Sequence, residues 1–527
     1  MELPVKEVCY RALQSRDARF DGLIYVGVKS TGIYCRPVCP ARTAKYENCS
    51  FFSSAAAAQQ AGFRPCLRCR PETAPNLASW RGTSNTVTRA VALIDEGALD
   101  GDHTNVEALA SRLGIGERQL RRLFRQHLGA SPIAVAQTRR ILFARQLIYE
   151  TQMPMTEIAL AAGFGSLRRF NEVFQKLFDR PPSALRRRAG GLSSNPAAGV
   201  TLRLRYCPPY DWASMLAYLE ARAIPGVETV SDGVYRRTIE IKGCSGTVEV
   251  SHLPQEESLA VSIHFPNVQC LPEIVNRLRR MFDLDADIGT IGAHLRADKL
   301  LAPLVAARPG LRAPGTWDPF ELAIRAVLGQ QISVAAARRF AGQFVALHGK
   351  SMSDAGNSSL SHLFPIPERL AEAESLGLKM PGARLATLQA LAQAASSDPS
   401  LFRLSGTIDD AISRLRNIRG IGEWTAQYIA MRALREADAF PATDIGLLRS
   451  VAKLAGRRVG ISELIQRAEG WRPWRAYAAQ HLWAADSITA VAGDSNEQKT
   501  RVVRGSCGDR NRRNDSRSRP GRELARH

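Results

Sequence analysis

Four cysteines near the N-terminus have the spacing of a metal site. Cys35 and Cys39 form one close pair, Cys66 and Cys69 form a second, and 26 residues separate the two pairs. Two such pairs can supply four thiolates to one tetrahedral zinc ion, so we predict one Zn²⁺ in this segment. Spacing alone favours a structural role, because most closed four-cysteine zinc sites only hold a fold.

The charge balance favours a polyanionic partner. The chain of 527 residues has 71 Lys and Arg against 50 Asp and Glu, a formal net charge of +21. No apolar run approaches the roughly 18 residues that a membrane span needs, so we expect a nucleic acid and no membrane partner. The first residues lack the layout of a secretory signal, which predicts a cytoplasmic protein.

Periodic patterns indicate which elements position these residues. Between residues 105 and 188, apolar residues recur at helical spacing, and the pattern returns about 50 residues later, with Gly114 matching Gly163 and Phe124 matching Phe174. This repeat predicts two helix-turn-helix units. Residues 200–305 mix strand-like alternation at 247–252 and 259–264 with a helical stretch at 212–223, which predicts an α+β region. Residues 315–490 have the pattern of helices joined by short Gly and Pro breaks.

A second candidate for chemistry lies near the C-terminal end. Gly420 and Gly422 fit a hairpin between two helices, where glycines let the backbone approach a phosphate that rests on the N–H groups of the next helix. A Gly-x-Gly pair alone is a weak signal. Asp444, a carboxylate placed after the following helix, strengthens it, because helix-hairpin-helix DNA glycosylases have this arrangement.

The zinc segment resembles the N-terminal domain of the Ada methylation-response family over about residues 4–75, on residues 27–42 and 61–69. The resemblance implies that Cys35 accepts a methyl group from a DNA methylphosphotriester, and that Thr31 and Arg42 lie close to the DNA backbone. A thioether cannot be turned over, so each molecule would act once. Loss of a negative charge beside the phosphates would strengthen promoter binding, which implies a methylation-activated regulator that works with RNA polymerase.

The doubled unit resembles the AraC-type DNA-binding domain, on residues 158–174 and 181–182. Two such units can enter successive major-groove segments of double-stranded DNA. The alternative for any single arginine is a solvated face. Asp179 stands where glycine is usual, and aspartate tolerates the left-handed conformation expected there. The residues expected to face the groove or the phosphates are Arg118, Gln119, Arg121, Arg122, Ser166, Arg168 and Arg169.

Residues 200–488 resemble the 3-methyladenine DNA glycosylase AlkA, on segments that include 208–222, 327–334 and 471–477. The resemblance implies that Asp444 is the catalytic carboxylate and that Gln331 fills the gap left by a flipped base. Electron-rich rings suit a cationic alkylated purine. The implied pocket residues are Trp424, Tyr428, Trp483 and Tyr218.

Three absences narrow the expected chemistry. Trp424 stands where strand-cleaving relatives have a lysine, which disfavours Schiff-base lyase chemistry. No four-cysteine run follows Trp483, so we expect no iron–sulfur cluster, and no organic cofactor is expected either. No Pro-Cys-His-Arg segment like that of the O6-methylguanine acceptor domain is present. We expect the protein to be a monomer.

The alternative function is a transcription factor or sensor whose C-terminal half binds DNA without catalysis, because Gln331 and Arg419 replace the usual leucine and proline.

Together these patterns predict a multi-domain, predominantly α chain. Composition breaks near residues 76–86, 188–199 and 492 separate the parts. The expected parts are a small α+β zinc domain (1–78), an all-α double helix-turn-helix (84–188), a linker (189–199), an α+β AlkA-type domain (200–312), an all-α helix-hairpin-helix glycosylase domain (313–490) and a disordered basic tail (491–527).

Overall fold

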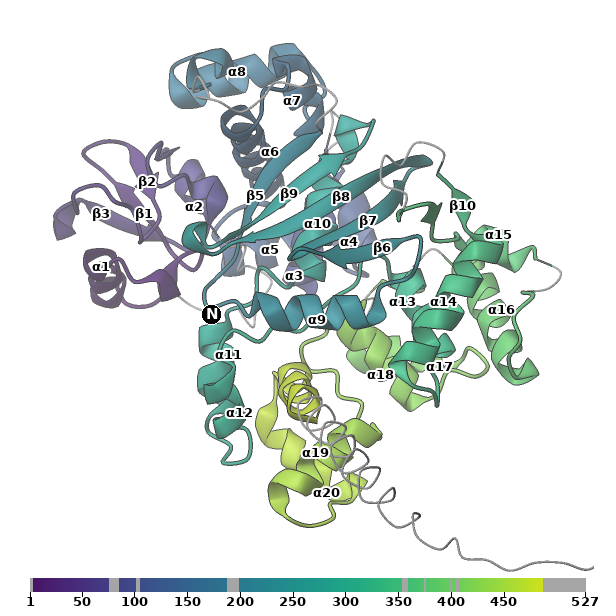
Figure 1. The fold of residues 1–527 in the computed structure, drawn as a ribbon. Coiled ribbons are helices and arrows are strands. Elements are labelled where there is room, and N and C mark those ends of the chain that lie inside the picture. Colours follow the sequence, from purple (N-terminus) through teal and green to yellow (C-terminus); the bar gives the residue numbers. More distant parts are fainter. Residues whose placement is uncertain are drawn as a thin grey trace, which may run out of the picture.

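The computed structural model describes residues 3–74, 85–100, 105–186, 199–352, 359–373, 376–398, 400–403 and 407–486. Figure 1 shows a five-stranded sheet in the middle, with the cysteine-bearing part on the left and a helical part on the right and below. No helix among the described residues is long and apolar enough to cross a membrane. The predicted tail and most of the predicted linker lie outside the described residues.

The cysteine-bearing part is a small sheet with two helices. The sheet order is β3-β1-β2-β4, antiparallel except for the parallel pair of β2 and β4. That parallel pairing aligns Tyr34 with Pro65. Cys35 directly follows Tyr34 and ends β2, and Cys66 directly follows Pro65, the last residue of β4. The register of the two strands therefore brings the two cysteine pairs together. The elements are α1 (Lys6–Ser15), β1 (Tyr25–Val28), β2 (Ile33–Cys35), β3 (Cys49–Phe52), α2 (Ala55–Gln60) and β4 (Arg64–Pro65).

The predicted helix-turn-helix repeat is present as two matching pairs of helices. In each pair the turn has a glycine with positive φ, Gly114 (+70°) and Gly163 (+80°), where a left-handed backbone favours glycine. Both second helices end on a left-handed residue, Gly129 (φ 67°) and Asp179 (φ 54°), so aspartate takes the conformation expected of it. The helices are α3 (Asn85–Asp95), α4 (Val106–Arg112), α5 (Glu117–Leu128), α6 (Pro132–Glu150), α7 (Met155–Ala161) and α8 (Leu167–Phe178).

Helix α6 joins the two units and also binds the cysteine-bearing part. Its Arg145 is fully buried, donates to the carbonyl of Cys66 at 2.8 Å and forms an ion pair with Glu72 at 3.2 Å. The same guanidinium lies over the rings of Tyr149 and of Phe178, at the end of α8. One buried cation thus connects the cysteine cluster, the linking helix and the second helix-turn-helix.

The central sheet has the strand order β5-β9-β8-β7-β6 and is antiparallel throughout. Its buried face shares one core with the second helix-turn-helix, since Phe170 and Phe174 belong to the same cluster as Leu202 and Val261. The elements of this part are β5 (Val200–Arg205), α9 (Trp212–Arg222), β6 (Glu228–Ser231), β7 (Val234–Ile241), β8 (Cys244–Leu253), β9 (Ser258–His264), α10 (Leu271–Met281), α11 (Ile288–Leu295) and α12 (Ala302–Ala307).

The rest of the chain is helical and surrounds a second large core. Two strands of two residues each, β10 (Lys350–Ser351) and β11 (His362–Leu363), add a small pair to the expected all-α fold, and residues 475–486 are helical. The helices are α13 (Pro319–Leu328), α14 (Val334–His348), α15 (Pro367–Ala371), α16 (Gly382–Ser397), α17 (Ile408–Arg416), α18 (Glu423–Arg432), α19 (Ile445–Ala455) and α20 (Ile461–Ala468). The predicted multi-domain, predominantly helical fold class is confirmed.

We expect Arg145→Met to destabilise the protein by about 1–3 kcal/mol, because the buried carboxylate of Glu72 keeps only its ion pair with Arg70 and the carbonyl of Cys66 loses its donor. The midpoint of urea unfolding, followed by circular dichroism, measures the change. Arg168→Met is the matched control, because that side chain is 89% exposed and should leave the midpoint unchanged. Equal midpoints for both variants would contradict the role given to Arg145.

Candidate functional site

The four predicted metal ligands meet in one cluster. The sulfur atoms of Cys35, Cys39, Cys66 and Cys69 all lie within 4.8 Å of one another, and those of Cys39 and Cys66 are 4.0 Å apart. A tetrahedral zinc ion with Zn–S bonds of about 2.3 Å would separate its sulfurs by about 3.8 Å. The donor set therefore fits zinc in number, chemistry and spacing.

Backbone amides stabilise the sulfur cluster. The N–H of Arg36 donates to Sγ of Cys69 at 3.3 Å, and the N–H of Arg68 donates to Sγ of Cys66 at 3.4 Å. The Arg36 side chain is buried, is paired with Asp21 and donates to the carbonyl of Cys69 at 3.1 Å. These bonds fix the second cysteine pair and place positive charge beside thiolates that carry negative charge.

The four ligands differ in exposure. Cys39, Cys66 and Cys69 are 5–7% exposed, whereas Cys35 is only partly buried. Cys35 also ends strand β2, directly after Tyr34, which is fully buried. Residue exposure thus distinguishes Cys35 from the three other ligands.

The residues predicted to contact DNA lie mostly on the surface. Thr31, Arg42 and Arg118 are exposed, as are Arg122 and Arg169. In the first unit, Arg121 pairs with Glu117 at 2.6 Å. None of these contacts identifies a base or a phosphate partner, so the assignments stay predictions.

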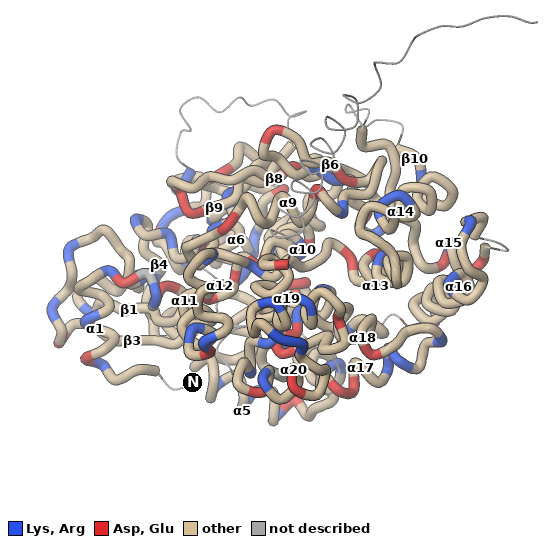
Figure 2. The backbone as a smooth tube through the Cα atoms, turned by 60° about the horizontal axis from the view of Figure 1, so that its bottom comes forward, with Lys and Arg blue, Asp and Glu red and all other residues tan. Residues whose placement is uncertain are grey.

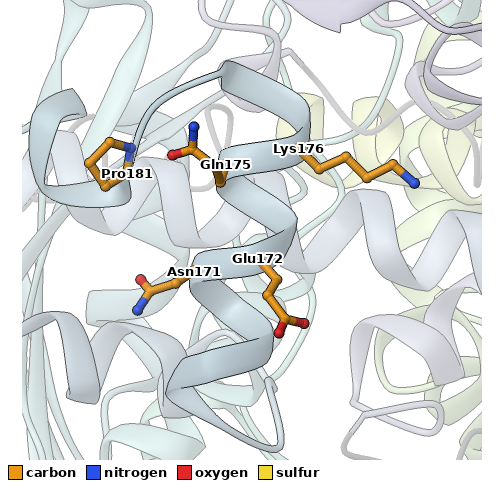
Figure 3. Close-up of a pocket in the computed structure, with 5 residues that line it drawn as sticks. All are labelled: Asn171, Glu172, Gln175, Lys176 and Pro181. Carbon is orange, nitrogen blue, oxygen red and sulfur yellow. The ribbon is translucent and has the colours of Figure 1, made fainter.

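Helix α8 exposes polar residues beyond those predicted to contact DNA. Ser166 caps the helix by accepting from the N–H of Arg169 at 3.2 Å, and Arg168 pairs with Glu172 at 2.9 Å. Figure 3 shows further polar side chains on the exposed surface of α8, beside the proline turn that follows it. These residues are Asn171, Gln175 and Lys176.

Asp444 lies at the centre of the second candidate site. The indole N–H of Trp424 donates to its Oδ2 at 2.8 Å, and the indole N–H of Trp483 donates to its Oδ1 at 2.8 Å. Oδ1 also accepts from the N–H of Leu447 at 2.9 Å, which makes Asp444 the N-cap of α19. Three N–H groups therefore hold the carboxylate, and the carboxylate in turn orients two aromatic rings.

The four predicted pocket residues are brought together. Trp424 stacks on Tyr428 with ring centroids 5.2 Å apart, and Tyr428 meets Trp483 edge-on at 6.4 Å. Tyr218 reaches this group from α9, with its hydroxyl 3.2 Å from that of Tyr428. All four side chains are partly exposed, so the group is open to solvent on one side.

A buried arginine that the sequence did not indicate lies behind these rings. The guanidinium of Arg432 is 5.0–5.6 Å from the ring centroids of Tyr218, Tyr428 and Trp483. Burial raises the pKa of Tyr218, but the cations of Arg432 and Arg222 outweigh it and lower that pKa to about 8. Arg432 is held by the carbonyl of Pro314 and the amide oxygen of Gln480. The partners of Arg432 are 118 and 48 residues away in the sequence, so no local motif predicts that it lies behind the rings.

The two hairpin glycines have different reasons to be glycine. Gly420 has φ +88°, and a Cβ there would lie 1.8 Å from the hydroxyl oxygen of Thr387 on α16. Helix packing therefore favours glycine at this position, and the expected phosphate contact of Gly420 stays a prediction. Gly422 is the N-cap of α18 and faces open space, so its surroundings suit the close approach of a phosphate.

The predicted wedge, Gln331, is exposed in the turn between α13 and α14. Basic residues lie on α14, α16, α19 and α20 of this helical part (Figure 2), where they suit a polyanion.

Three family models match the chain. The metal binding domain of Ada matches residues 8–72, a helix-turn-helix domain matches 109–188, and the AlkA N-terminal domain matches 201–318. A Mycobacterium tuberculosis protein named "Probable bifunctional transcriptional activator/DNA repair enzyme AlkA" is 43% identical over 481 residues, which cover 90% of this chain and 96% of that protein.

The chain belongs to this AlkA family. Its C-terminal half is also 34% identical over 283 residues to the DNA-3-methyladenine glycosylase 2 of Escherichia coli, covering 53% of this chain and 95% of that enzyme. Its N-terminal part is 37% identical over 155 residues to the bifunctional transcriptional activator/DNA repair enzyme Ada of Escherichia coli, covering 29% of this chain and 42% of that protein. These matches confirm the three resemblances, with DNA as partner and zinc as metal.

We expect the two hairpin glycines to respond differently to alanine. Gly420→Ala should cost at least about 1–3 kcal/mol, because alanine is strained at φ +88° and its Cβ meets Thr387. Gly422→Ala should leave the free energy of unfolding nearly unchanged, because its Cβ meets nothing. Urea unfolding of both variants checks this, and an equally destabilised Gly422→Ala would contradict the distinction.

Proposed function

We propose that the chain repairs alkylated DNA and reports its presence. The C-terminal half hydrolyses the N-glycosidic bond of 3-methyladenine-type alkylated purines after base flipping. The N-terminal half accepts a methyl group from DNA methylphosphotriesters on Cys35 and then acts as a transcriptional regulator. The observation that carries the glycosylase assignment is the carboxylate of Asp444, held by the indoles of two tryptophans that belong to a cluster of aromatic rings.

The glycosylase step needs little more than a positioned carboxylate. A purine alkylated at N3 or N7 is already cationic, so the C1′–N bond breaks with its electron pair moving to the base, which leaves neutral. The negative charge of Asp444 stabilises the oxocarbenium-like sugar and accepts a proton from the water that adds to C1′. Because both indoles donate to Asp444, its position relative to the rings is fixed before the substrate arrives.

The rings suit a cationic base. Trp424, Tyr428 and Trp483 offer π-faces, which attract positive charge and stack on an extruded base. The cluster of Asp444 with these rings favours catalysis over the alternative of a C-terminal half that only binds DNA. Arg419 is exposed on the hairpin, and its charge is compatible with a phosphate contact in place of the usual proline.

The methyl transfer is a displacement at carbon. The thiolate of Cys35 attacks the methyl carbon, an S–CH₃ bond forms, and the O–CH₃ bond breaks so that the phosphate recovers its negative charge. A zinc ion held by Cys35, Cys39, Cys66 and Cys69 would keep the thiolate deprotonated at neutral pH. The partial exposure of Cys35, compared with the three buried ligands, supports its assignment as acceptor.

Contacts into α6 suit a sensor. Tyr34, beside Cys35, accepts from Gln59 at 3.1 Å, and Gln59 accepts from Thr138 of α6 at 3.0 Å. Tyr34 is thus connected through two hydrogen bonds to the helix that joins both DNA-binding units, and the zinc ligand Cys66 is bonded to the same helix directly through Arg145. Recruitment of RNA polymerase, a monomeric state, a cytoplasmic location and the lack of other cofactors stay predictions.

We expect Asp444→Asn to lower the rate of base release by at least about 10²–10³-fold, because the amide carries no charge to stabilise the sugar cation. Asparagine is also a good N-cap, so the fold should survive. Free 3-methyladenine released from methylated DNA measures the rate. Asp287→Asn, which changes the N-cap of α11, is the control and should retain activity. A fully active Asp444→Asn would disprove the assignment.

We expect mass spectrometry to find one added methyl group on Cys35 after the zinc-loaded protein meets DNA that contains methylphosphotriesters. Fragment ions should show Cys39, Cys66 and Cys69 unmodified, and the buried Cys49 serves as an internal control. An unmodified Cys35 in zinc-bound protein would restore a purely structural role for the cluster.

A further inference from the structure

The turn that carries the predicted wedge is bonded to the phosphate-binding hairpin. Gln330, the residue before Gln331, donates its side-chain amide to the carbonyl of Gly420 at 3.2 Å and to the hydroxyl of Thr425 at 3.1 Å. Gly420 is 90 residues further along the chain, in the hairpin, and Thr425 is in the first turn of α18. A single side chain therefore connects the two loops.

Both partners of Gln330 are rigidly placed. Thr425 is 3% exposed, and Gly420 is in close contact with Thr387 of α16. Helix α16 holds the other side of the turn as well, since Arg384 donates to the main-chain carbonyl of Gln330 at 2.6 Å. Gln330 is thus fixed at its side chain and at its backbone.

Gln331 itself depends on such support. Its φ is +58°, a left-handed backbone conformation that a residue with a side chain seldom adopts, and it is exposed. Backbone strain of this kind persists where the surrounding structure fixes it. The fixed neighbour on the N-terminal side is Gln330.

We infer that Gln330 is a positioning residue for base extraction, which rests on the glycosylase function proposed above. It fixes the position of Gln331 relative to the hairpin that contains Gly420 and Gly422. When Gly422 and the N-terminus of α18 hold a DNA phosphate, the wedge then lies at a fixed depth in the base stack. Gln330 contacts neither the base nor the sugar, and it acts through Gln331.

The variant that tests this is Gln330→Met, which keeps the length of the side chain and removes both N–H donors. Base release is measured on two duplexes, one with the lesion paired and one with it opposite an abasic-site analogue, where extrusion costs less. We expect kcat/KM on the paired lesion to fall about ten- to hundredfold, consistent with two lost hydrogen bonds. The unpaired lesion should be released within about twofold of the wild-type rate.

A direct readout of flipping accompanies the rates. The fluorescence of 2-aminopurine next to the paired lesion, which rises when its neighbour leaves the stack, should be reduced in the variant. The double variant Gln330→Met/Gln331→Ala should lose no more activity on the paired lesion than the worse single variant, because both act in one step.

The control is Gln389→Met, since Gln389 also donates its amide to a main-chain carbonyl, that of Ala373 at 3.1 Å, away from the turn. It should release both lesions as the wild type does. Equal losses on both duplexes for Gln330→Met, multiplicative losses in the double variant, or no loss at all would overturn the inference. A wild-type protein that releases no base would instead refute the proposed glycosylase, so the two failures are distinguishable.

Discussion

A buried positive charge determines how the N-terminal half is assembled. The guanidinium of Arg145 is removed from water, which is unfavourable by several kcal/mol unless partners replace the lost hydration. Those partners come from different segments: the carboxylate of Glu72, the carbonyl of a zinc ligand, and two rings, one at the end of α8. The cysteine cluster and the second helix-turn-helix have to come together around α6 for the charge to be tolerated. The zinc centre is therefore part of the same assembly as the helices that read DNA.

In the C-terminal half, Asp444 accepts three hydrogen bonds from the protein. It is the N-cap of α19, and it orients the side chains of Trp424 and Trp483. The buried guanidinium of Arg432 lies 5.6 Å from the ring centroid of Tyr428 and 5.3 Å from that of Trp483. The ring cluster thus has a carboxylate on one side and a buried guanidinium on another.

Local patterns were enough for the features that depend on neighbouring residues. The spacing of Cys35 to Cys39 and of Cys66 to Cys69 predicted a cluster that the structure contains. The repeat of Gly114 at Gly163 predicted both turns of the helix-turn-helix units. Family resemblance, and not periodicity, predicted Asp444 and its rings.

The contacts that the sequence did not predict connect residues that are far apart along the chain. Arg145 and Cys66 are 79 positions apart, and Gln330 and Gly420 are 90 apart. No window along the sequence contains both partners of either bond. The glycine pair predicted a phosphate contact for Gly420, which stays a prediction, but it gave no indication that a Cβ there would meet Thr387 on another helix. Such reasons appear only when three-dimensional packing is known.

The shared core of α6–α8 and the central sheet also bears on how such a gene can evolve. Phe170, Phe174 and Val261 are buried in one core, so each half would expose apolar side chains to water without the other. A split of the gene between the regulator and the glycosylase would leave an apolar face on each product, and selection would first have to replace it with polar residues. Once the two halves share a core, a split of the gene is therefore disfavoured, and the halves are inherited together and produced in a fixed one-to-one ratio.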